Sequence, residues 1–512
     1  MISCSMSDYC WWIERVMKIV IVENPRPLTV DHYNDVANAP LSASLNSGYA
    51  LAVARRAGWK AAYLDFTVDD RDAAAIAAVI LAEDADIVLF HWVYSWGHED
   101  FVRNLLDYLR RESDARLGAF GLFPSLSGSR LLQFAQSLDF ILSGEFEETL
   151  AELLPSFEAG HALAALPGVM LRDGILVPRP LVSDLATLPV PDDIGANCNY
   201  PNLNIAASRG CYGECSFCFI HRYYGCSRRR TLGLDSLERE LEIRLSRRDV
   251  KSLYFIDPTF IGQGSSERER TVEISRMAKR FGLPFGFETR VDSLDERLMQ
   301  TLAANGATSA FLGIESGCDS VLQRIGKRIN TEQIRRGVQI VRECGIKLNL
   351  GFIMFEPDST LAELEENYAF LDGLGLLAEH ELTANLLYHN QIVLYGSAAW
   401  SSFGREGRLL VDEGLPFEAR YRFRDERVGL VCSAMGRITS RYFSALDTMR
   451  EGCSGSSAVS TRESEINALL KEAFCSLCLT ACVSSPQQVN RLELDLISRI
   501  TFCCSSSAPY GN

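Results

Sequence analysis

The sequence predicts an α/β protein with two parallel sheets: a Rossmann-like doubly wound domain, then a partial (β/α)6 TIM-type barrel, and last a small, mostly helical C-terminal region. Two series of short apolar runs, each alternating with amphipathic stretches, predict this architecture, because parallel strands need crossover helices between them. A proline-bearing linker at 184–202 separates the two series. We therefore expect domains at 18–160 and 201–410, a hairpin and linker at 161–200, and the helical region at 411–512.

The first series begins near Lys18, where we expect folded structure to start. Its apolar runs predict buried parallel strands at 18–22, 61–66, 86–92, 116–123 and 139–145, and its amphipathic stretches predict helices at 41–58, 70–84, 99–112 and 128–137. A hairpin is expected at 168–180, because Asp173-Gly174 lies between two extended runs and Asp-Gly favours a tight turn. In a doubly wound sheet, ligands bind beyond the carboxyl ends of the strands.

The second series predicts the barrel. Strands are expected at 204–208, 252–257, 285–290, 309–315, 347–355 and 384–395, with helices at 235–248, 268–282, 294–306 and 331–345. Six β/α units are too few to close a full barrel, and the active site of a barrel lies at the C-terminal ends of its strands. Beyond it we expect helix to about 451, a flexible Gly/Ser linker at 452–464, and a serine-rich tail at 501–512 that differs from the body of the chain.

The overall composition of the 512 residues predicts a soluble, cytoplasmic protein. Hydrophobic residues make up 47% and charged residues 23%, and no uninterrupted apolar run approaches the roughly 18 residues of a membrane span. The N-terminus has no basic region followed by an apolar one, as a secretory signal would. A net charge of -15 disfavours nucleic acid, because phosphate binding relies on clustered Lys and Arg. We expect neither a membrane nor a nucleic-acid partner.

The cysteines point to a metal centre. Three of the sixteen, Cys211, Cys215 and Cys218, lie within eight residues, and none lies between Cys10 and Cys198. Soft thiolates select zinc, copper(I) or iron-sulfur clusters. A zinc-stabilised scaffold or interaction protein would need a fourth ligand, such as His221, Cys226 or a distant residue. A four-iron cluster with three thiolates leaves one iron open to a ligand, and the loop's position after the first barrel strand favours that alternative.

The CxxxCxxC motif opening a partial barrel resembles the radical S-adenosylmethionine (SAM) superfamily. The resemblance implies a [4Fe-4S] cluster held by Cys211, Cys215 and Cys218. It also implies that the cluster donates an electron that cleaves S-adenosylmethionine, and that the resulting 5'-deoxyadenosyl radical removes hydrogen from a small-molecule substrate. The partner implied is an electron donor such as a flavodoxin or ferredoxin.

The resemblance also assigns cofactor-binding residues on the barrel. Phe217, before the third cysteine, is expected near the adenine, and Glu315 of "GIESG" near the ribose. The segment "LNLGFIMFEPDST" resembles the fifth-strand segment that passes the adenine. The second- and third-strand ends that would face the cofactor contribute Asp257, Glu288 and Arg290. Taken singly, each charged residue is equally well explained as an ordinary strand-end salt bridge.

A doubly wound sheet before such a barrel resembles the cobalamin-binding subclass. The turns after its third, fourth and fifth strands are those that approach the corrin in related domains. They supply the predicted cobalamin contacts Ser95, Gly121, Pro124, Ser125, Gly144 and Glu145. The DxHxxG motif of many cobalamin domains is missing, since Asp31 and His32 are adjacent here. Coordination of cobalt by a protein histidine is therefore not predicted, and His91 and His98 are weak alternatives.

The function implied is that of a cobalamin-dependent radical SAM methyltransferase, which moves a methyl group through methylcobalamin to an unactivated carbon, or a phosphinate phosphorus, of a small molecule in antibiotic biosynthesis. We expect substrate contacts from the helical residues 411–451, with "FEARYRFRDERV", and from the predicted sixth strand, with Asn385, Tyr388 and His389 as candidates. Simple capping of the barrel explains these segments equally well.

Three other interpretations of the motifs and cysteines were weighed against this function. A non-methylating cobalamin-domain oxidoreductase or cyclase stays open. A methylthiotransferase would carry three further cysteines in the N-terminal domain, and residues 11–197 have none. Finally, Cys475, Cys478 and Cys482 lie at a spacing that could hold metal along one helix face, although incidental thiols explain them better.

Overall fold

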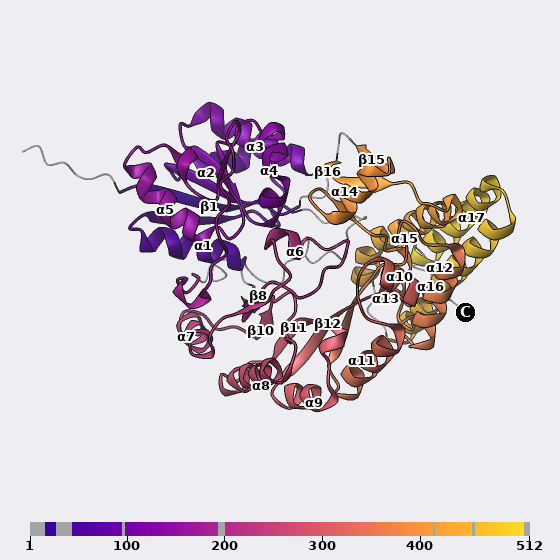
Figure 1. The fold of residues 1–512 in the computed structure, drawn as a ribbon. Coiled ribbons are helices and arrows are strands. Elements are labelled where there is room, and N and C mark those ends of the chain that lie inside the picture. Colours follow the sequence, from indigo (N-terminus) through magenta and orange to yellow (C-terminus); the bar gives the residue numbers. More distant parts are fainter. Residues whose placement is uncertain are drawn as a thin grey trace, which may run out of the picture.

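The computed structural model describes residues 16–26, 44–94, 98–192, 200–412, 415–452 and 456–505. Figure 1 shows an N-terminal α/β domain in indigo and purple beside a second α/β domain in magenta and pink, with the orange and yellow C-terminal helices packed on the latter's far side. The prediction of two α/β domains followed by a helical region is confirmed.

The N-terminal sheet has six strands in the order β2-β1-β3-β4-β5-β6. They are β1 (Lys18–Glu23), β2 (Lys60–Asp65), β3 (Ile87–His91), β4 (Arg116–Phe120), β5 (Phe140–Leu142) and β6 (Val169–Leu171). The first five are parallel, as predicted, and β6 joins the edge antiparallel. The order reverses between β1 and β3, so ligands are expected at the carboxyl edge of these strands.

Helices cover both faces of this sheet. They are α1 (Leu45–Arg56), α2 (Ala73–Leu81), α3 (Glu99–Glu112), α4 (Leu122–Phe134) and α5 (Glu147–Glu158). Ser44 and Asp72 cap α1 and α2 by accepting hydrogen bonds from Ser47 N and Ala75 N, which satisfies backbone donors that a helix start leaves free. Because helices cover both faces, β3 is buried throughout and reads as a continuous apolar run.

The predicted hairpin at 168–180 is wrong. The chain turns at Arg172–Gly174 after β6, but the returning segment forms no strand, and the one backbone bond between the two runs is Gly168 N to Val177 O at 2.8 Å. β6 pairs instead with β5, with Met170 opposite Ile141. The Asp-Gly signal located the turn correctly, but the open edge of the larger sheet provided the pairing partner.

The second sheet has five parallel strands in the order β13-β12-β11-β10-β7. They are β7 (Asn202–Ile205), β10 (Ser252–Phe255), β11 (Phe285–Arg290), β12 (Ala307–Glu315) and β13 (Lys347–Phe352). The helices around it are α7 (Leu234–Leu245), α8 (Ser265–Arg280), α9 (Glu296–Ala304), α10 (Asp319–Arg324), α11 (Thr331–Glu343) and α12 (Leu361–Gly373). The short pair β8 (Ser208–Arg209) and β9 (Arg230–Thr231) and the helix α6 (Ile220–Tyr223) belong to the cysteine region.

The predicted sixth strand at 384–395 is wrong. Its first part lies in helix α13 (His380–Tyr388), and only a single parallel bridge, Phe355 to Asn390, stands where a sixth strand would pair. Leu386 and Leu387 are buried in the core that α13 shares with the C-terminal helices α15 and α16. A short apolar run does not distinguish strand from helix, and here contacts with distant helices decided it.

The C-terminal region begins with strands rather than helices. After β14 (Val393–Leu394) and α14 (Ala398–Arg405), strands β15 (Leu409–Asp412) and β16 (Leu415–Tyr421) form an antiparallel sheet in the order β14-β16-β15. The predicted helix starts only at Glu426. On β16, Phe417 packs edge-on against Phe123 of α4, with ring centroids 4.9 Å apart, so this small sheet is fixed to the N-terminal domain.

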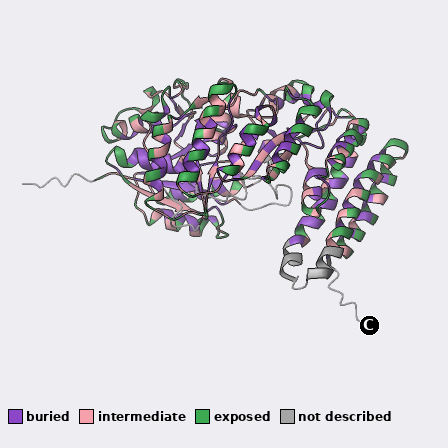
Figure 2. Ribbon diagram, turned by 90° about the horizontal axis from the view of Figure 1, so that it is seen from below, coloured by how far each residue is buried: buried purple, intermediate pink, exposed green. Residues whose placement is uncertain are grey.

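Three long helices complete the chain: α15 (Glu426–Gly452), α16 (Ser456–Val483) and α17 (Pro486–Ser505). The expected flexible linker is wrong from Ser456 onwards, where α16 begins, and the expected tail is helical as far as Ser505. Buried residues such as Leu470 and Phe474 hold α16 against its neighbours, so tertiary packing overrides the poor local signal of a Ser-rich sequence. Figure 2 shows buried purple along the facing sides of these helices and exposed green outside.

Within the described part of the chain, one helical segment is long and apolar enough to span a membrane by length and composition alone. It is Arg462–Val483 of α16, and 44% of its most apolar window is buried inside the protein. This helix packs against α12, α13, α15 and α17.

We predict that Phe474→Ala lowers the free energy of unfolding by about 3–5 kcal/mol, because Phe474 is 1% exposed and stacks on Tyr368 at 5.5 Å. Urea unfolding followed by circular dichroism measures this loss. The control is Leu479→Ala on the same helix, where the side chain is 66% exposed and a change within about 0.5 kcal/mol is expected. Equal losses in both variants would contradict the placement of α16 in the core.

Candidate active site

The three predicted cluster ligands lie together on the loop that follows β7, at the C-terminal edge of the second sheet. Cys215 is buried, and Cys211 and Cys218 are half-buried. Backbone hydrogen bonds shape the loop: Cys218 N donates to Cys215 O at 3.1 Å, and Ser216 N donates to Ile325 O at 2.9 Å. The cysteine side chains therefore emerge from a loop that is held both by itself and by a neighbouring segment.

A single-ion zinc site finds no donor set here. Among the residues that the structure describes, which include the whole cysteine loop, no three His, Cys, Asp or Glu side chains converge as one metal ion would require. In a four-iron cluster each thiolate binds a different iron, so its sulfurs need not converge on one point. The late cysteines differ in exposure: Cys478 is buried, whereas Cys475 and Cys482 are exposed.

A buried cation lies beside the cysteines. Arg290, at the end of β11, places Nη1 3.8 Å from Cys215 Sγ, stacks on Tyr212 at 5.2 Å, and donates from Nε to Asp292 at 2.9 Å. Burial raises the pKa of the Cys215 thiol, and attraction to Lys327 and Arg290 offsets part of that rise. A Cβ on Gly213 would lie 2.9 Å from Arg290 Nη1, so the glycine leaves room for this approach.

Glu315, the predicted ribose contact, lies at the end of β12 in an unusual conformation. Its φ is +62°, a left-handed value that few non-glycine residues adopt. It is 8% exposed, and its Oε1 accepts a hydrogen bond from Lys327 Nζ at 2.8 Å. A Cβ on Gly313 would lie 2.5 Å from Glu315 Oε1 and 2.7 Å from Lys327 Nζ. A side chain at position 313 would therefore displace the ends of both partners of this ion pair.

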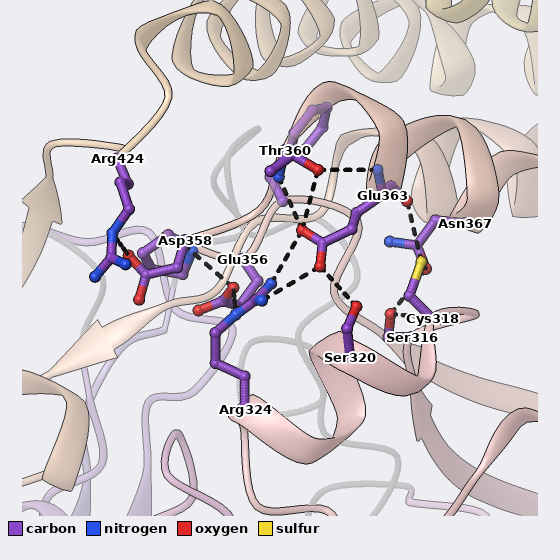
Figure 3. A network of polar contacts seen from close by, with 12 residues as sticks. Ser316, Cys318, Ser320, Arg324, Glu356, Asp358, Thr360, Glu363, Asn367 and Arg424 are labelled. Carbon is purple, nitrogen blue, oxygen red and sulfur yellow. Dashed lines mark hydrogen bonds and ion pairs between the residues drawn. The ribbon is translucent and has the colours of Figure 1, made fainter.

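A polar network fixes the segment that follows Glu315 (Figure 3). Asn367 of α12 accepts hydrogen bonds through Oδ1 from Ser316 Oγ at 2.8 Å and from Gly317 N at 2.6 Å. Glu363, one turn earlier on α12, accepts from Ser320 at 2.6 Å and from Arg324 at 3.2 Å.

The same network reaches the next strand end and the C-terminal region. Arg324 Nε also donates to Glu356 at 2.7 Å, after β13, and Asp358 pairs with Arg424 at 3.2 Å. Asp358 also pairs with Arg408 at 2.6 Å. The strand ends that flank Glu315 are thus connected to α12 and to the segment before α15.

Two predicted carboxylates lie at the ends of the second and third strands. Asp257 accepts hydrogen bonds from Ala207 N at 3.0 Å and from Ser208 Oγ, and burial raises its pKa to about 6. Glu288 accepts from Tyr254 OH at 3.2 Å, and burial raises its pKa to about 7. Asp257 therefore anchors the start of the cysteine segment. Its role in cofactor binding stays a prediction, as do those of Glu288 and Arg290.

The predicted cobalamin contacts lie at the carboxyl edge of the N-terminal sheet. Ser125 Oγ donates to Gly121 O at 2.7 Å and accepts from Gly144 N at 2.9 Å, so it joins two of these turns. Gly121 has φ +108°, and a Cβ there would lie 3.0 Å from the ring of His91. Pro124 is buried in the first turn of α4. Ser95, Asp31 and His32 lie outside the described residues.

His91 at this edge is fully engaged within the protein. Its Nδ1 lies 2.8 Å from Glu23 Oε1, and its Nε2 lies 3.3 Å from Asn46 Nδ2. Burial alone would raise the pKa of the Glu23 carboxyl, but attraction to His91 and Arg26 outweighs it and lowers the pKa to about 2. The structure therefore gives His91 a structural partner rather than a free ring nitrogen.

Glu145 ties the two domains together. It pairs with Arg209 at 3.1 Å and with Arg230 at 2.8 Å, both from the second domain, and Arg209 also reaches Glu147 at 2.6 Å. Tyr223 OH donates to Gly144 O at 2.7 Å. The two carboxylates, Glu145 and Glu147, are nearly inaccessible, so a shift of either domain would leave a buried charge unpaired.

The docked domains enclose a cavity of about 330 Å³. Its lining comes from the N-terminal domain, the cysteine region, the ends of β12 and β13, and the segment before and including β14: Val93, Tyr94, Leu122, Phe123, Phe217, Phe219, Glu315, Gly351, Phe352, Ile353, His389, Asn390, Gln391, Ile392 and Leu394. Sequence analysis predicted Phe217, Glu315 and His389 among these. It placed Asn385 and Tyr388 on a strand, but both belong to helix α13 and neither lines this cavity.

The segment "LNLGFIMFEPDST", which was expected to pass the adenine, supplies Gly351, Phe352 and Ile353 to the lining. Other lining residues were not singled out. Among them, Val93 and Tyr94 follow a strand whose carboxyl end was expected to carry a ligand. Lys327 and Asn367 were also missed, because a lysine in "GKR" and an asparagine in a helix carry no local sign of contact with Glu315.

Comparisons with known proteins agree with this geometry. Residues 205–371 match the family model described as Radical SAM superfamily, so this part of the chain is a radical SAM domain. The chain is 25% identical over 375 residues to "Uncharacterized methyltransferase PH0819" of Pyrococcus horikoshii, covering 71% of this chain and 79% of that protein. It is 28% identical over 285 residues to "4'-phospho-dehydrooxetanocin synthase" of Priestia megaterium, covering 50% of this chain but 38% of that protein.

The fold as a whole matches solved structures. The cobalamin-dependent S-adenosylmethionine radical enzyme OxsB superposes with a TM-score of 0.76 at 18% identity, covering 96% of this chain and 80% of that chain. The radical S-adenosylmethionine methyltransferase TsrM from Kitasatospora setae superposes with a TM-score of 0.57 at 18% identity, covering 70% of this chain and 71% of that chain. The chain therefore contains a radical SAM domain at residues 205–371 and has the overall fold of OxsB.

We predict that Asp257→Asn flattens the pH dependence of stability. A carboxyl whose pKa is about 6 in the folded state, against about 3.8 when unfolded, stabilises the fold when protonated, so stability falls as pH rises through 6. Between pH 5 and pH 7.5 the wild type should lose about 1 kcal/mol more than the variant in urea unfolding. Asp249→Asn, on the exposed surface, is the control and should behave as the wild type. Identical slopes in all three proteins would contradict the raised pKa.

Proposed function

We propose that the protein is a cobalamin-dependent radical SAM methyltransferase that acts on a small molecule. One observation carries the proposal: residues of the cysteine region and residues at the carboxyl edge of the N-terminal sheet line the same cavity. Methyl transfer to a substrate radical requires the radical source and the methyl carrier to reach one carbon, and a cavity shared by the two domains supports such a reaction. The names of PH0819 and TsrM, both methyltransferases, support the same reaction.

The residues present fit the three cofactors. Three thiols in a loop beside buried cations suit a cluster with one open iron. Gly313 and Gly351 leave Glu315 open to the cavity for the nucleoside. Gly144 has φ +76°, and a Cβ added to it would meet nothing within 4 Å, so a flat macrocycle can approach this edge of the sheet.

The described residues would perform distinct tasks. When bound, the cluster, SAM and cobalamin supply the electron, the radical source and the methyl carrier. Cys211, Cys215 and Cys218 would hold the cluster, and Arg290 would balance its negative charge. Phe217, Phe219 and Phe352 line the cavity with apolar rings and exclude water, which protects a reactive carbon radical. His389, Asn390 and Gln391 are the polar lining residues available to orient a substrate.

A non-methylating reaction is the second candidate. One relative is named a synthase rather than a methyltransferase, and its match spans half of this chain. Both reactions would use the same cavity and the same cysteines. They differ in the products: methyl transfer yields S-adenosylhomocysteine together with 5'-deoxyadenosine, whereas a ring-forming or dehydrogenating reaction yields 5'-deoxyadenosine without methylated product.

We predict that Cys215→Ala abolishes formation of 5'-deoxyadenosine, because the remaining two thiols cannot hold a cluster with one open iron. Anaerobic reconstitution with iron and sulfide, reduction with dithionite and chromatography of the SAM products measure this loss. Cys475→Ala, on the exposed face of α16, is the matched control and should keep wild-type iron content and product formation. Continued 5'-deoxyadenosine formation by Cys215→Ala would overturn the ligand assignment.

We predict that wild-type protein reconstituted with cluster and cobalamin forms S-adenosylhomocysteine and 5'-deoxyadenosine in the same reaction once a substrate is present. Deuterated methyl-SAM should add the mass of one labelled methyl group to that substrate, which mass spectrometry detects. A substrate consumed with 5'-deoxyadenosine but without label would select the non-methylating candidate.

A further inference from the structure

The structure assigns a role to Lys327, a residue that sequence analysis did not single out. We propose that Lys327 is a positioning residue that orients Glu315 toward the nucleoside of bound SAM and makes that orientation depend on the cysteine loop. This inference rests on the proposed function, because it concerns how the same cavity holds SAM. It adds a residue and a route of contact that connect the two halves of the site.

The first support is the burial of the ion pair. Lys327 is 5% exposed, and its ammonium lies 2.8 Å from Glu315 Oε1, inside the space that Gly313 leaves open. A lysine is rarely buried unless it is paired, so the position of its ammonium is determined by Glu315. In turn Glu315 has one oxygen engaged by Lys327, and a Cβ on Gly351 would lie 3.5 Å from the other. The second oxygen therefore points toward the cavity edge that Gly351 lines.

The second support is the loop that carries Lys327, residues 325–328, which contacts the cysteine loop at several points. Ile325 O accepts from Ser216 N at 2.9 Å, and Arg328 donates to Glu214 at 2.6 Å. The Lys327 carbonyl accepts from Arg290 Nη2 at 2.6 Å, and Nη1 of the same guanidinium lies 3.8 Å from Cys215 Sγ. A chain of direct contacts therefore runs from Cys215 through Arg290 and Lys327 to Glu315.

The third support is backbone strain at Glu315 itself and at Arg328, the residue that follows Lys327. Arg328 has φ +58° and Glu315 has φ +62°, so each non-glycine residue occupies the left-handed region. Such conformations persist where surrounding contacts hold them, and they concentrate at binding sites. On the other side of Glu315, Asn367 fixes Ser316 and Gly317, as Figure 3 shows. Glu315 is thus held from behind by α12, and its side chain is directed by Lys327.

The test uses SAM affinity and ribose recognition of the reconstituted, oxygen-free protein. Lys327→Gln should keep wild-type iron content but bind SAM about tenfold to hundredfold more weakly in equilibrium dialysis, as expected for loss of a charge-assisted contact. It should also lose the wild type's preference for SAM over its 2'-deoxy analogue, because a misplaced Glu315 no longer reads the ribose. Lys347→Gln, on the exposed start of β13, is the control and should match the wild type.

A second variant perturbs the pair without removing a charge. Gly313→Ala places a methyl group between Glu315 and Lys327 and should reproduce both effects, whereas Gly373→Ala, with nothing within 4 Å, should not. This pair of variants decides the question if Lys327→Gln fails to fold because Glu315 is left as an unpaired buried charge. In a Glu315→Gln background, Lys327→Gln should add little further loss, since Lys327 acts through Glu315.

Three outcomes would overturn the inference. The first is unchanged SAM binding in Lys327→Gln or, if that variant does not fold, in Gly313→Ala. The second is equal weakening of the binding of SAM and of its 2'-deoxy analogue, which would indicate that Lys327 contacts another part of SAM directly. The third is full additivity of the losses in Lys327→Gln and Glu315→Gln. These failures are distinct from failure of the proposed function. If the wild type itself takes up no cluster or binds no SAM, the proposed function fails before any variant is compared.

Discussion

The structure depends on one constraint: the carboxyl edges of two parallel sheets must face each other across a shared cavity. Each sheet alone would expose its ligand-binding edge to solvent. The buried ion cluster in which Glu145 meets Arg209 and Arg230 determines how the edges meet, because any other docking would leave buried charges unpaired. Such a cluster contributes specificity of orientation more than stability. The cavity and its largely apolar lining both follow from this docking.

Within the second domain, the cysteine loop is connected to the rest of the site by charged groups that are themselves buried. Arg290 contacts both Cys215 and the carbonyl of Lys327, and Lys327 contacts Glu315. Burial opposes the charged ammonium, but attraction to Glu315 more than compensates and raises the pKa of Lys327. Charges that are fixed in this way before a ligand binds need little reorganisation to stabilise charge of opposite sign. The same contacts make the positions of these residues mutually dependent.

The C-terminal region has a direct part in forming the cavity. Leu394 of β14 lines it, and Phe417 of β16 packs on Phe123 of the N-terminal domain. Helices α15 and α16 bury one side of α13, which precedes the polar lining residues His389, Asn390 and Gln391. The barrel lacks a sixth strand at the position where α13 and this small sheet lie. The segment that would have closed the barrel instead carries lining residues for the cavity.

Sequence by itself determined the features that depend on local pattern. Apolar periodicity predicted all five parallel strands of each series, and the spacing of Cys211, Cys215 and Cys218, with "GIESG" around Glu315, predicted the cluster loop and one wall of the site. Tertiary structure decided the rest. Residues 380–388 became a helix, and β6 paired with β5 instead of with the segment after its own turn. A Ser-rich segment became the start of α16. Packing also brought Lys327 to Glu315, and Asn367 to the two residues that follow Glu315. The physical reason is that strand periodicity and metal-ligand spacing are set by neighbours along the chain, whereas burial, ion pairing and strand partners depend on residues that meet only after the domains pack.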